Sequence, residues 1–405
     1  MFPELNVGYP SGGYPAGVGD GKFWTQDEVR ELVVYARLRG VRLIPEMEMP
    51  QHARCLLPLV KTQGLQFCNV SFPVMLYDDP EGKTVAVLKK LVDEMASLFP
   101  DDVFHLGMDE AQCSVPVIEN DPLDAGACGV VCNATTIRSL EHKMLLHVQD
   151  VLGKRPMAWQ NALFDCGDIM GCEPASARRT KSGKPFGVNP SEKPATDGAA
   201  STVINIYAAS HIWLDGKSTE QTPLWLAANA TAQGFYATQT DANHLYLDTG
   251  TTSPAGYAAT LWYDISGGLI TSEIQKQHFL GGGVCLWSDS YCSLAAECGG
   301  WATCIGGSTP TSKCAGSSGW MQDSKYDRQF IQSAGGLLFP RSNIAAGSLW
   351  NYNATLSHAS EEFVARTRRL AAVMEERDVM GLCPPGCSCS FGGRCGQSYS
   401  PGSAN

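Results

Sequence analysis

Long apolar runs and clusters of basic residues are both absent from this 405-residue sequence. Without a run of about 18 apolar residues, the sequence predicts no transmembrane helix. Only 18% of the residues are charged, and 41 acidic residues outnumber 30 Lys and Arg, for a net charge of -11. Nucleic acids and anionic membranes are therefore not expected as partners, because both attract basic surfaces. A neutral ligand such as a sugar stays compatible with this charge.

A secretory leader is also missing, since residues 1–5 carry neither a basic region nor an apolar stretch. The rest of the chain nevertheless has the chemistry of a secreted protein, with sixteen cysteines. Four acceptor sequons for N-glycosylation occur, at Asn69, Asn133, Asn229 and Asn353. We therefore expect the secretory pathway, either a lysosome or vacuole or the extracellular space, although the signal peptide is not present in this sequence.

The last residues form a cysteine-rich segment. Its cysteines are Cys383, Cys387, Cys389 and Cys395, in a stretch rich in Pro, Gly and Ser. Such a cluster can bind zinc or form disulfides, and the lack of a nearby His favours a small disulfide-stapled tail. We therefore divide the chain into a main domain, residues 1–380, and a tail, residues 381–405.

Apolar periodicity predicts that helices and strands alternate along the main domain. Thr25 and Glu28 form a capping box that begins the first helix, and Gly40 follows its end. The predicted helices cover residues 25–40, 84–99, 136–152, 223–234, 272–279 and 360–377. The predicted strands cover residues 41–46, 103–107, 156–160, 203–207, 244–248 and 283–287, with long loops at 166–200 and 290–320. This alternation indicates an α/β fold with a parallel sheet, which for this length is a (β/α) barrel.

Two adjacent carboxylates, Asp109 and Glu110, end the apolar strand that begins at residue 103. Strand alternation places His105, Gly107 and Asp109 on one face, and the turn after the strand can bring Glu110 to the same opening. Two acids with different pKa values suit acid-assisted cleavage of an acetal. The alternative is an ordinary strand-to-loop junction with solvated acids.

The segment from His105 to Glu110 reads His-Leu-Gly-Met-Asp-Glu and resembles the His-x-Gly-Gly-Asp-Glu signature of the β-N-acetylhexosaminidases of glycoside hydrolase family 20. Residues 35–52 are similar to the helix, third strand and Pro-Gly-His turn of that family, and further matches continue to about residue 380. The resemblance implies a (β/α)8 TIM-type barrel. Only about six βα units are recognisable, so we expect an N-terminally incomplete barrel that lacks two strands and the preceding β-domain. Alternatively, residues 1–24 rebuild the missing wall.

The resemblance implies an exo-acting retaining glycoside hydrolase that releases terminal β-linked N-acetylglucosamine or N-acetylgalactosamine. Its substrate would be a glycan or chitooligosaccharide, it would need no metal and no cofactor, and a homodimer is one assembly open to it. The sugar-binding Arg of the family's first strand has no counterpart here. A truncated, catalytically impaired glycan-binding homologue is therefore the alternative. A disulfide-rich structural protein would leave the ordered motifs unexplained.

Site roles follow from the same resemblance. Glu110 would be the general acid and then the base, while Asp109 would accept the acetamido N–H and orient the acetamido oxygen as nucleophile. His52 and His105 would support them, with His52 or Glu48 tuning the acid. For each histidine the alternative is a satisfied core residue.

The resemblance also assigns residues that contact the sugar. Tyr246 and Asp248 would bind the acetamido carbonyl and a hydroxyl, and Asp289 would contact hydroxyls. Trp159, Trp287 and, more loosely, Trp262 would wall the pocket, although a buried Trp is more often part of a core. Two finer expectations concern neighbours of the site: Met108, in place of a Gly of the signature, would narrow the pocket, and Cys68 would pair with Cys113.

Overall fold

A computed structural model gives the three-dimensional structure of the chain. It describes residues 5, 24–68, 75–110, 134–163, 202–214, 217–247, 260–287, 338, 341–356 and 360–376. The chain forms two compact units. Unit 1 comprises Met1–Tyr9, Gly19–Gln239 and Gly268–Leu280, and unit 2 comprises Pro10–Val18, Thr240–Gly267 and Gly281–Asn405.

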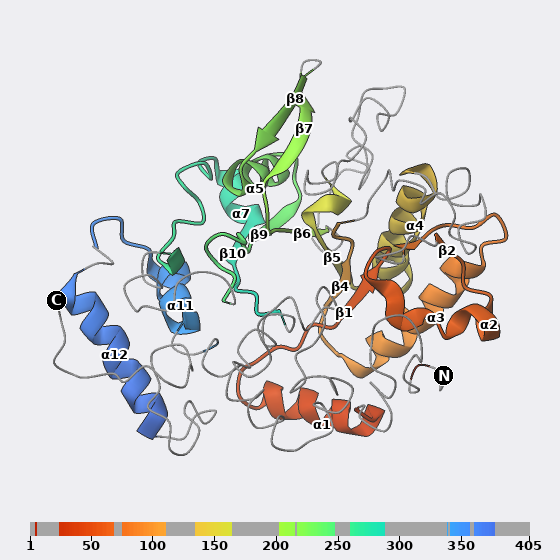
Figure 1. The fold of residues 1–405 in the computed structure, drawn as a ribbon, viewed down its shortest axis with the longest axis horizontal. Coiled ribbons are helices and arrows are strands. Elements are labelled where there is room, and N and C mark those ends of the chain that lie inside the picture. Colours follow the sequence, from red (N-terminus) through yellow and green to blue (C-terminus); the bar gives the residue numbers. More distant parts are fainter. Residues whose placement is uncertain are drawn as a thin grey trace, which may run out of the picture. The chain divides into compact units, whose positions relative to one another are not determined.

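A six-stranded sheet in the order β1-β4-β5-β6-β9-β10 organises the fold (Figure 1). Its strands are β1 (Glu46–Met49), β4 (Val103–Gly107), β5 (Arg155–Trp159), β6 (Val203–Ile206), β9 (Tyr236–Gln239) and β10 (Phe279–Gly282). The first five strands pair in parallel, with Glu46 opposite His105 and His105 opposite Met157. Parallel strands bring their carboxyl ends to one edge of the sheet, which is where α/β proteins build their sites. The predicted α/β class with a mostly parallel sheet is therefore confirmed.

Helices follow the strands in alternation, as the sequence predicts. They are α1 (Gln26–Arg37), α2 (Leu59–Gln63), α3 (Lys83–Leu98), α4 (Ala134–Leu146), α5 (Pro223–Ala232), α7 (Glu273–His278), α11 (Arg341–Asn351) and α12 (Glu361–Glu376). Single turns of other helical types cover Ala53–Leu56, His147–Val151 and Gln160–Ala162. Two antiparallel pairs complete the described elements: β2 (Phe67–Cys68) with β3 (Met75–Leu76), and β7 (Ser210–Leu214) with β8 (Lys217–Gln221).

The start of α1 shows how local chemistry sets an element. The Glu28 N–H donates to Thr25 Oγ1 at 3.2 Å, and the Thr25 N–H donates to Glu28 Oε2 at 2.7 Å. These two bonds satisfy backbone donors that a helix start leaves unpaired. The predicted capping box is confirmed.

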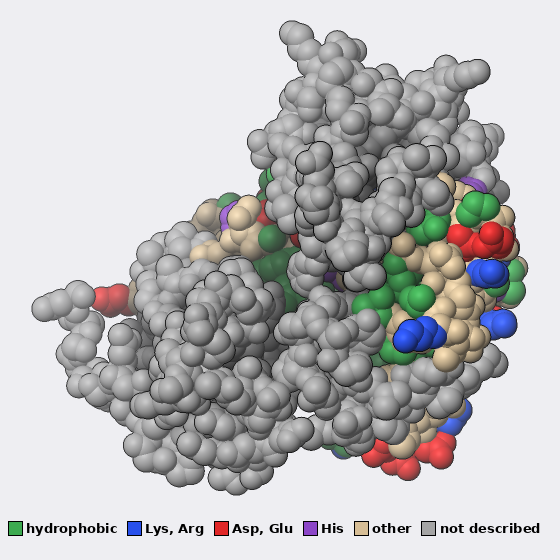
Figure 2. Space-filling model, turned by 45° about the vertical axis from the view of Figure 1, so that its right-hand side comes forward, with side chains coloured by type: hydrophobic (Ala, Val, Ile, Leu, Met, Phe, Trp, Pro, Cys, Tyr) green, Lys and Arg blue, Asp and Glu red, His purple; other side chains and the backbone are tan. Residues whose placement is uncertain are grey.

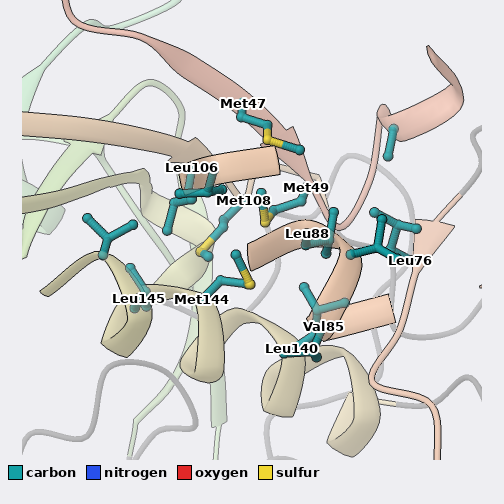
Figure 3. Close-up of a cluster of buried hydrophobic side chains, with 14 of the residues drawn as sticks. Met47, Met49, Leu76, Val85, Leu88, Leu106, Met108, Leu140, Met144 and Leu145 are labelled. Atoms are coloured by element: carbon teal, nitrogen blue, oxygen red, sulfur yellow. The ribbon is translucent and has the colours of Figure 1, made fainter. Parts of the chain in front are cut away.

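The largest core of unit 1 lies between the sheet and the helices α3 and α4 (Figure 3). Phe104 and Leu106 alternate along β4, Met108 follows directly after it, and all three side chains are fully buried. They pack in one cluster with Leu88 of α3 and Met144 of α4. Burying a side chain of this size contributes roughly 1.5–3 kcal/mol. The opposite side of β4, with His105 and Gly107, is thus left for polar chemistry.

Two of the six predicted strands are wrong in position. Residues 244–248 do not form a strand in the described part, where Tyr246 makes only an isolated bridge with Cys285. The fifth strand is β9, and the sixth is β10 rather than residues 283–287. We missed β9 because its sequence, Tyr-Ala-Thr-Gln, lacks an apolar run. Its polar side chains are satisfied within the sheet: Thr238 Oγ1 donates to Asn205 Oδ1 at 3.0 Å.

Two smaller differences concern the first strand and the hairpin. The first strand was predicted at 41–46, but β1 begins only at Glu46, directly after Pro45, a residue without an N–H to donate. The β7–β8 hairpin occupies residues for which no strands were predicted. The predicted loops 166–200 and 290–320 and the tail 381–405 lie outside the described residues.

Charged side chains of both signs lie on the surface of the described residues. On the face in Figure 2, the Lys, Arg, Asp and Glu side chains of the described residues occur in small separate groups, and no continuous basic surface forms there. None of the described helices combines the length and the apolar character that crossing a membrane requires.

Candidate active site

Asp109 and Glu110 follow β4 and lie against His52, which follows the neighbouring strand β1. His52 Nε2 lies 3.3 Å from Glu110 Oε2 and 3.7 Å from Asp109 Oδ2. His52 and Glu110 both have positive φ angles, 56° and 50°, which residues other than Gly rarely adopt. Such backbone strain concentrates at functional sites and persists only when surrounding contacts hold it.

The two carboxylates change the titration of His52. Burial disfavours the charged imidazolium, but the hydrogen bond with Glu110 and the charges of Asp109 and Glu110 together raise the pKa of His52 above its ordinary value. The imidazole can therefore carry a proton next to both acids.

Glu48 forms a hydrogen-bonded carboxyl pair with Asp109. Burial and the charge of Asp109 raise the pKa of Glu48 to about 11, so Glu48 holds the proton of the pair at neutral pH. Burial also raises the pKa of Asp109, while His52 and the bond with Glu48 counteract it. Apart from the carboxyl pair with Glu48, no hydrogen-bond partner of the buried Asp109 Oδ1 occurs in the part of the chain that the structure describes.

Gly107 allows this carboxyl pair to form. Its φ is +68°, and a Cβ at this position would lie 2.1 Å from Glu48 Oε1. The Met108 N–H, one residue further on, donates to the same Glu48 oxygen at 3.1 Å. Only a residue without a side chain leaves room for Glu48 beside the strand.

Met108 does not narrow the site, contrary to the expectation from the sequence. Its side chain is fully buried in the core between the sheet and α4, close to Met49, Leu106 and Met144 (Figure 3). β4 ends at Gly107, and the positive φ angles of Gly107 and Met108, 68° and 72°, turn the chain there, so the turn after the strand sets the placement of Met108.

Trp159, at the end of β5, packs beside His105 on the polar side of the sheet. The two rings meet edge to face, with centroids 5.2 Å apart, and Tyr207 contacts the indole in the same way at 5.5 Å. Trp159 Nε1 donates to Glu46 Oε1 at 2.9 Å, and His105 Nδ1 lies 3.1 Å from the same oxygen. The sequence predicted Trp159 and His105 but missed Glu46, although Glu46 shares the strand face of Glu48.

A second network supports the backbone of Glu110. Asn161 Oδ1 accepts hydrogen bonds from the Glu110 N–H at 3.4 Å and from the Tyr207 hydroxyl at 3.2 Å. The main-chain carbonyl of Asn161 accepts from Arg138 Nη1 at 2.6 Å, and the same nitrogen pairs with Glu141 at 2.6 Å. A buried ion pair on α4 thus fixes the turn after β5, and that turn fixes Glu110. Nothing in the sequence pattern singles out Asn161.

Unit 2 holds Tyr246 and Trp287, two of the predicted sugar contacts. Their rings lie 6.2 Å apart, and the segments that carry them run in parallel, joined by the Tyr246–Cys285 bridge. Trp287 is 37% exposed, which suits a wall more than a core. Trp262, in contrast, packs against Phe363 with ring centroids 5.2 Å apart. Its role as a wall stays a prediction.

Other expectations fall outside the described residues. Asp248, Asp289 and Cys113 lie there, so the roles of the two acids and the Cys68–Cys113 pairing stay predictions. Among the described residues, no group of His, Cys, Asp and Glu has the arrangement of a metal site.

Comparison with known proteins identifies part of the chain. Residues 11–173 match the model of the glycosyl hydrolase family 20 catalytic domain. These residues belong to glycosyl hydrolase family 20. The matched region contains five of the predicted site residues: His52, His105, Asp109, Glu110 and Trp159.

Curated beta-hexosaminidases are similar to part of the chain. The beta-hexosaminidase of Vibrio furnissii is 29% identical over 158 residues, which are 35% of this chain and 24% of that enzyme. Subunit beta of the beta-hexosaminidase of Mus musculus is 30% identical over 183 residues, which are 40% of this chain and 31% of that subunit. The chain therefore spans less than a third of the length of these relatives.

Solved family 20 structures share the fold. The beta-N-acetylhexosaminidase of Bacteroides fragilis superposes with a TM-score of 0.55 over 93% of this chain and 60% of that one, at 18% identity. At this identity the likeness describes the fold alone.

Replacing Gly107 by Ala tests the carboxyl pair of Glu48 and Asp109. We expect Gly107→Ala to lower the melting temperature strongly, because the new Cβ would displace the Glu48 carboxylate. Gly82→Ala is the matched control: its φ is also +68°, yet nothing lies within 4 Å of its Cβ. Thermal unfolding should show a loss of about 1–2 kcal/mol for the control, the cost of the left-handed backbone, and a clearly larger loss for Gly107→Ala. Equal losses would contradict the close packing of Glu48.

The protonated state of Glu48 predicts a pH-dependent stability. In the folded protein the pKa of Glu48 is about 11, whereas in the unfolded chain Glu48 loses its proton near the ordinary pKa of 4.5. The folded state binds more protons in this window, so the contribution of Glu48 to stability falls as the pH rises above about 4.5. Glu48→Gln, which is neutral at every pH, should therefore gain melting temperature relative to wild type between pH 5 and pH 8, by at least about 3 °C. A difference that does not change with pH would contradict the assignment. Glu81→Gln, on the exposed surface, serves as the control.

Proposed function

We propose that the chain is an exo-acting β-N-acetylhexosaminidase that works with retention, through substrate-assisted catalysis. One observation carries this proposal: His52 lies within 3.7 Å of both adjacent carboxylates, and Asp109 is paired with the protonated Glu48. An acid beside the leaving oxygen and a second carboxylate that accepts hydrogen bonds are what this reaction needs. The family 20 match of residues 11–173 supports the same proposal.

In the first step Glu110 acts as the general acid. Its proton moves to the glycosidic oxygen as the bond from that oxygen to the anomeric carbon breaks. The acetamido oxygen of the substrate forms the new bond to the anomeric carbon, which gives a cyclic oxazolinium ion. His52, 3.3 Å from Glu110 Oε2, would hold the carboxyl group in position and stabilise its ionised form after transfer.

Asp109 would orient the acetamido group during that step. Its carboxylate would accept the acetamido N–H, which turns the carbonyl oxygen toward the anomeric carbon, and its negative charge would balance the positive charge that develops there. Because Glu48 already supplies a proton to the pair, Asp109 can stay an acceptor at neutral pH.

In the second step Glu110 acts as the base. It takes a proton from water, the water oxygen bonds to the anomeric carbon, and the bond to the acetamido oxygen breaks. Two inversions at one carbon give net retention.

In unit 1, Trp159 would contact the terminal N-acetylhexosamine through its aromatic face. The sugar contacts of Tyr246, Asp248, Trp262, Trp287 and Asp289 stay predictions from the resemblance. We further infer that the six-stranded sheet is the recognisable part of a (β/α)8 barrel, that the protein acts in the secretory pathway, and that its substrates are glycans or chitooligosaccharides.

Hydrolysis of chromogenic glycosides tests the proposal. Purified chain should release chromophore from the β-linked N-acetylglucosaminide or N-acetylgalactosaminide. It should leave the matching β-glucoside, which lacks the acetamido nucleophile, essentially uncleaved. Equal cleavage of the β-glucoside would contradict substrate assistance, and no cleavage of either N-acetyl substrate would contradict the proposed activity.

A further inference from the structure

Glu46 is the first residue of β1 and makes contacts that reach across three strands. One oxygen, Oε1, accepts from Trp159 Nε1 of β5 at 2.9 Å and lies 3.1 Å from His105 Nδ1 of β4. The register explains the second contact, because Glu46 and His105 are direct partners in the β1–β4 pair. Trp159 comes from the strand beyond, so its indole must extend over His105 to reach the same oxygen.

The bond to Glu46 fixes the rotation of the indole. Trp159 is only 4% exposed, and the ring edges of His105 and Tyr207 contact it. These apolar contacts fix where the ring lies, but a hydrogen bond fixes which edge points toward β1. An indole has a single N–H donor, and Glu46 accepts it.

Glu46 is ionised, which strengthens both contacts. Burial raises the pKa of Glu46, but the hydrogen bond and charge of His105 and the bond from Trp159 outweigh it and lower this pKa below the ordinary value. A carboxylate accepts stronger hydrogen bonds than a neutral group does. The same negative charge is one of the causes that raise the pKa of Glu48. Glu46 therefore connects the aromatic side of the site with its carboxyl pair.

We propose that Glu46 is a positioning residue of this site: through one carboxylate oxygen shared with His105, it holds the Trp159 indole as a wall for the N-acetyl sugar. The sugar part of this statement rests on the proposed function. The contact itself does not, since it involves only residues of the chain.

Nuclear magnetic resonance of the full chain, labelled with 15N-tryptophan, tests the contact without any substrate. Trp159→Phe identifies the indole N–H signal of Trp159. In Glu46→Leu, which cannot accept, the proton signal should move clearly upfield. In Glu46→Gln, whose amide oxygen accepts more weakly than a carboxylate, the signal should move part of the way. Glu81→Gln should leave the signal in place. An unmoved signal in Glu46→Gln overturns the proposal, even if Glu46→Leu does not fold.

Kinetics then separate positioning from a purely structural role. With the β-N-acetylglucosaminide, Glu46→Leu should raise KM roughly tenfold, the effect of losing one charged hydrogen bond, while Glu46→Gln should recover most of that loss. An unchanged KM in a folded Glu46→Leu would contradict the role in sugar binding. If the wild-type chain cleaves nothing while the indole signal still moves in both variants, the proposed function fails and the Glu46 contact stands. If the chain is active and the signal does not move, the inference fails and the function stands.

Discussion

Glu110→Gln should lower kcat/KM for a methyl or disaccharide β-N-acetylglucosaminide by roughly 10²–10⁴-fold, the range of general acid catalysis. Gln keeps the size of Glu110 and can still contact His52, but it has no proton to give to the leaving oxygen. The loss should depend on the leaving group. A 4-nitrophenyl group leaves without protonation, so the first step should slow much less with that substrate.

Steady-state rates for the two substrates measure this difference. Glu81→Gln removes one carboxylate from the exposed surface and should leave both rates unchanged. A Glu110→Gln protein that loses the same factor with both leaving groups would argue against Glu110 as the acid. Full activity with the methyl glycoside would remove Glu110 from the mechanism.

Asp109→Asn should lower kcat by about 10²–10³-fold, the range for removing one preorganised group that stabilises transition-state charge. The substitution places an amide where the acetamido N–H needs an acceptor, and it removes the negative charge that balances the oxazolinium ion. Since Asp109 acts on the acetamido group and not on the leaving oxygen, the loss should be similar for 4-nitrophenyl and methyl glycosides. This pattern distinguishes Asp109 from Glu110.

The melting temperature of Asp109→Asn shows independently whether this variant is folded. Asp109 is a buried acid with a raised pKa, so neutral Asn should not lower the melting temperature and should raise it slightly. The control is Asp27→Asn, at a highly exposed side chain that pairs with Arg30. An Asp109→Asn protein that unfolds easily would mean that its rate loss reports damage rather than chemistry.

Much of the fold could be predicted from the sequence because its signals are local. The capping box at Thr25 and Glu28 defines the start of α1, and helical spacing of apolar residues defines α3 and α12. The strand β9 could not be predicted in this way. Its side chains Thr238 and Gln239 are polar: Thr238 is half-buried and donates a hydrogen bond to Asn205 of the neighbouring strand, and Gln239 is fully buried.

The same distinction between local signals and contacts between strands applies to the candidate site. The positions of Asp109 and Glu110 follow from one short motif and from the alternation of one strand. The contact between Glu46 and Trp159 could not be predicted, because it depends on the register of β1, β4 and β5 together. The burial of Met108 was open to prediction, because Met108 stands two residues after the buried Leu106. The family signature has a Gly at this place, and that difference suggested a pocket residue instead.

One measurement tests the central claim most directly, namely that the substrate supplies its own nucleophile. The chain would be assayed with 4-nitrophenyl β-N-acylglucosaminides whose acyl group carries zero, one, two or three fluorines. Fluorine withdraws electrons from the carbonyl oxygen and makes it a poorer nucleophile, while the size of the group changes little. The account predicts that log(kcat/KM) falls steadily with each fluorine. Rates that stay the same across the series would mean that the acetamido oxygen does not attack, and would contradict the account.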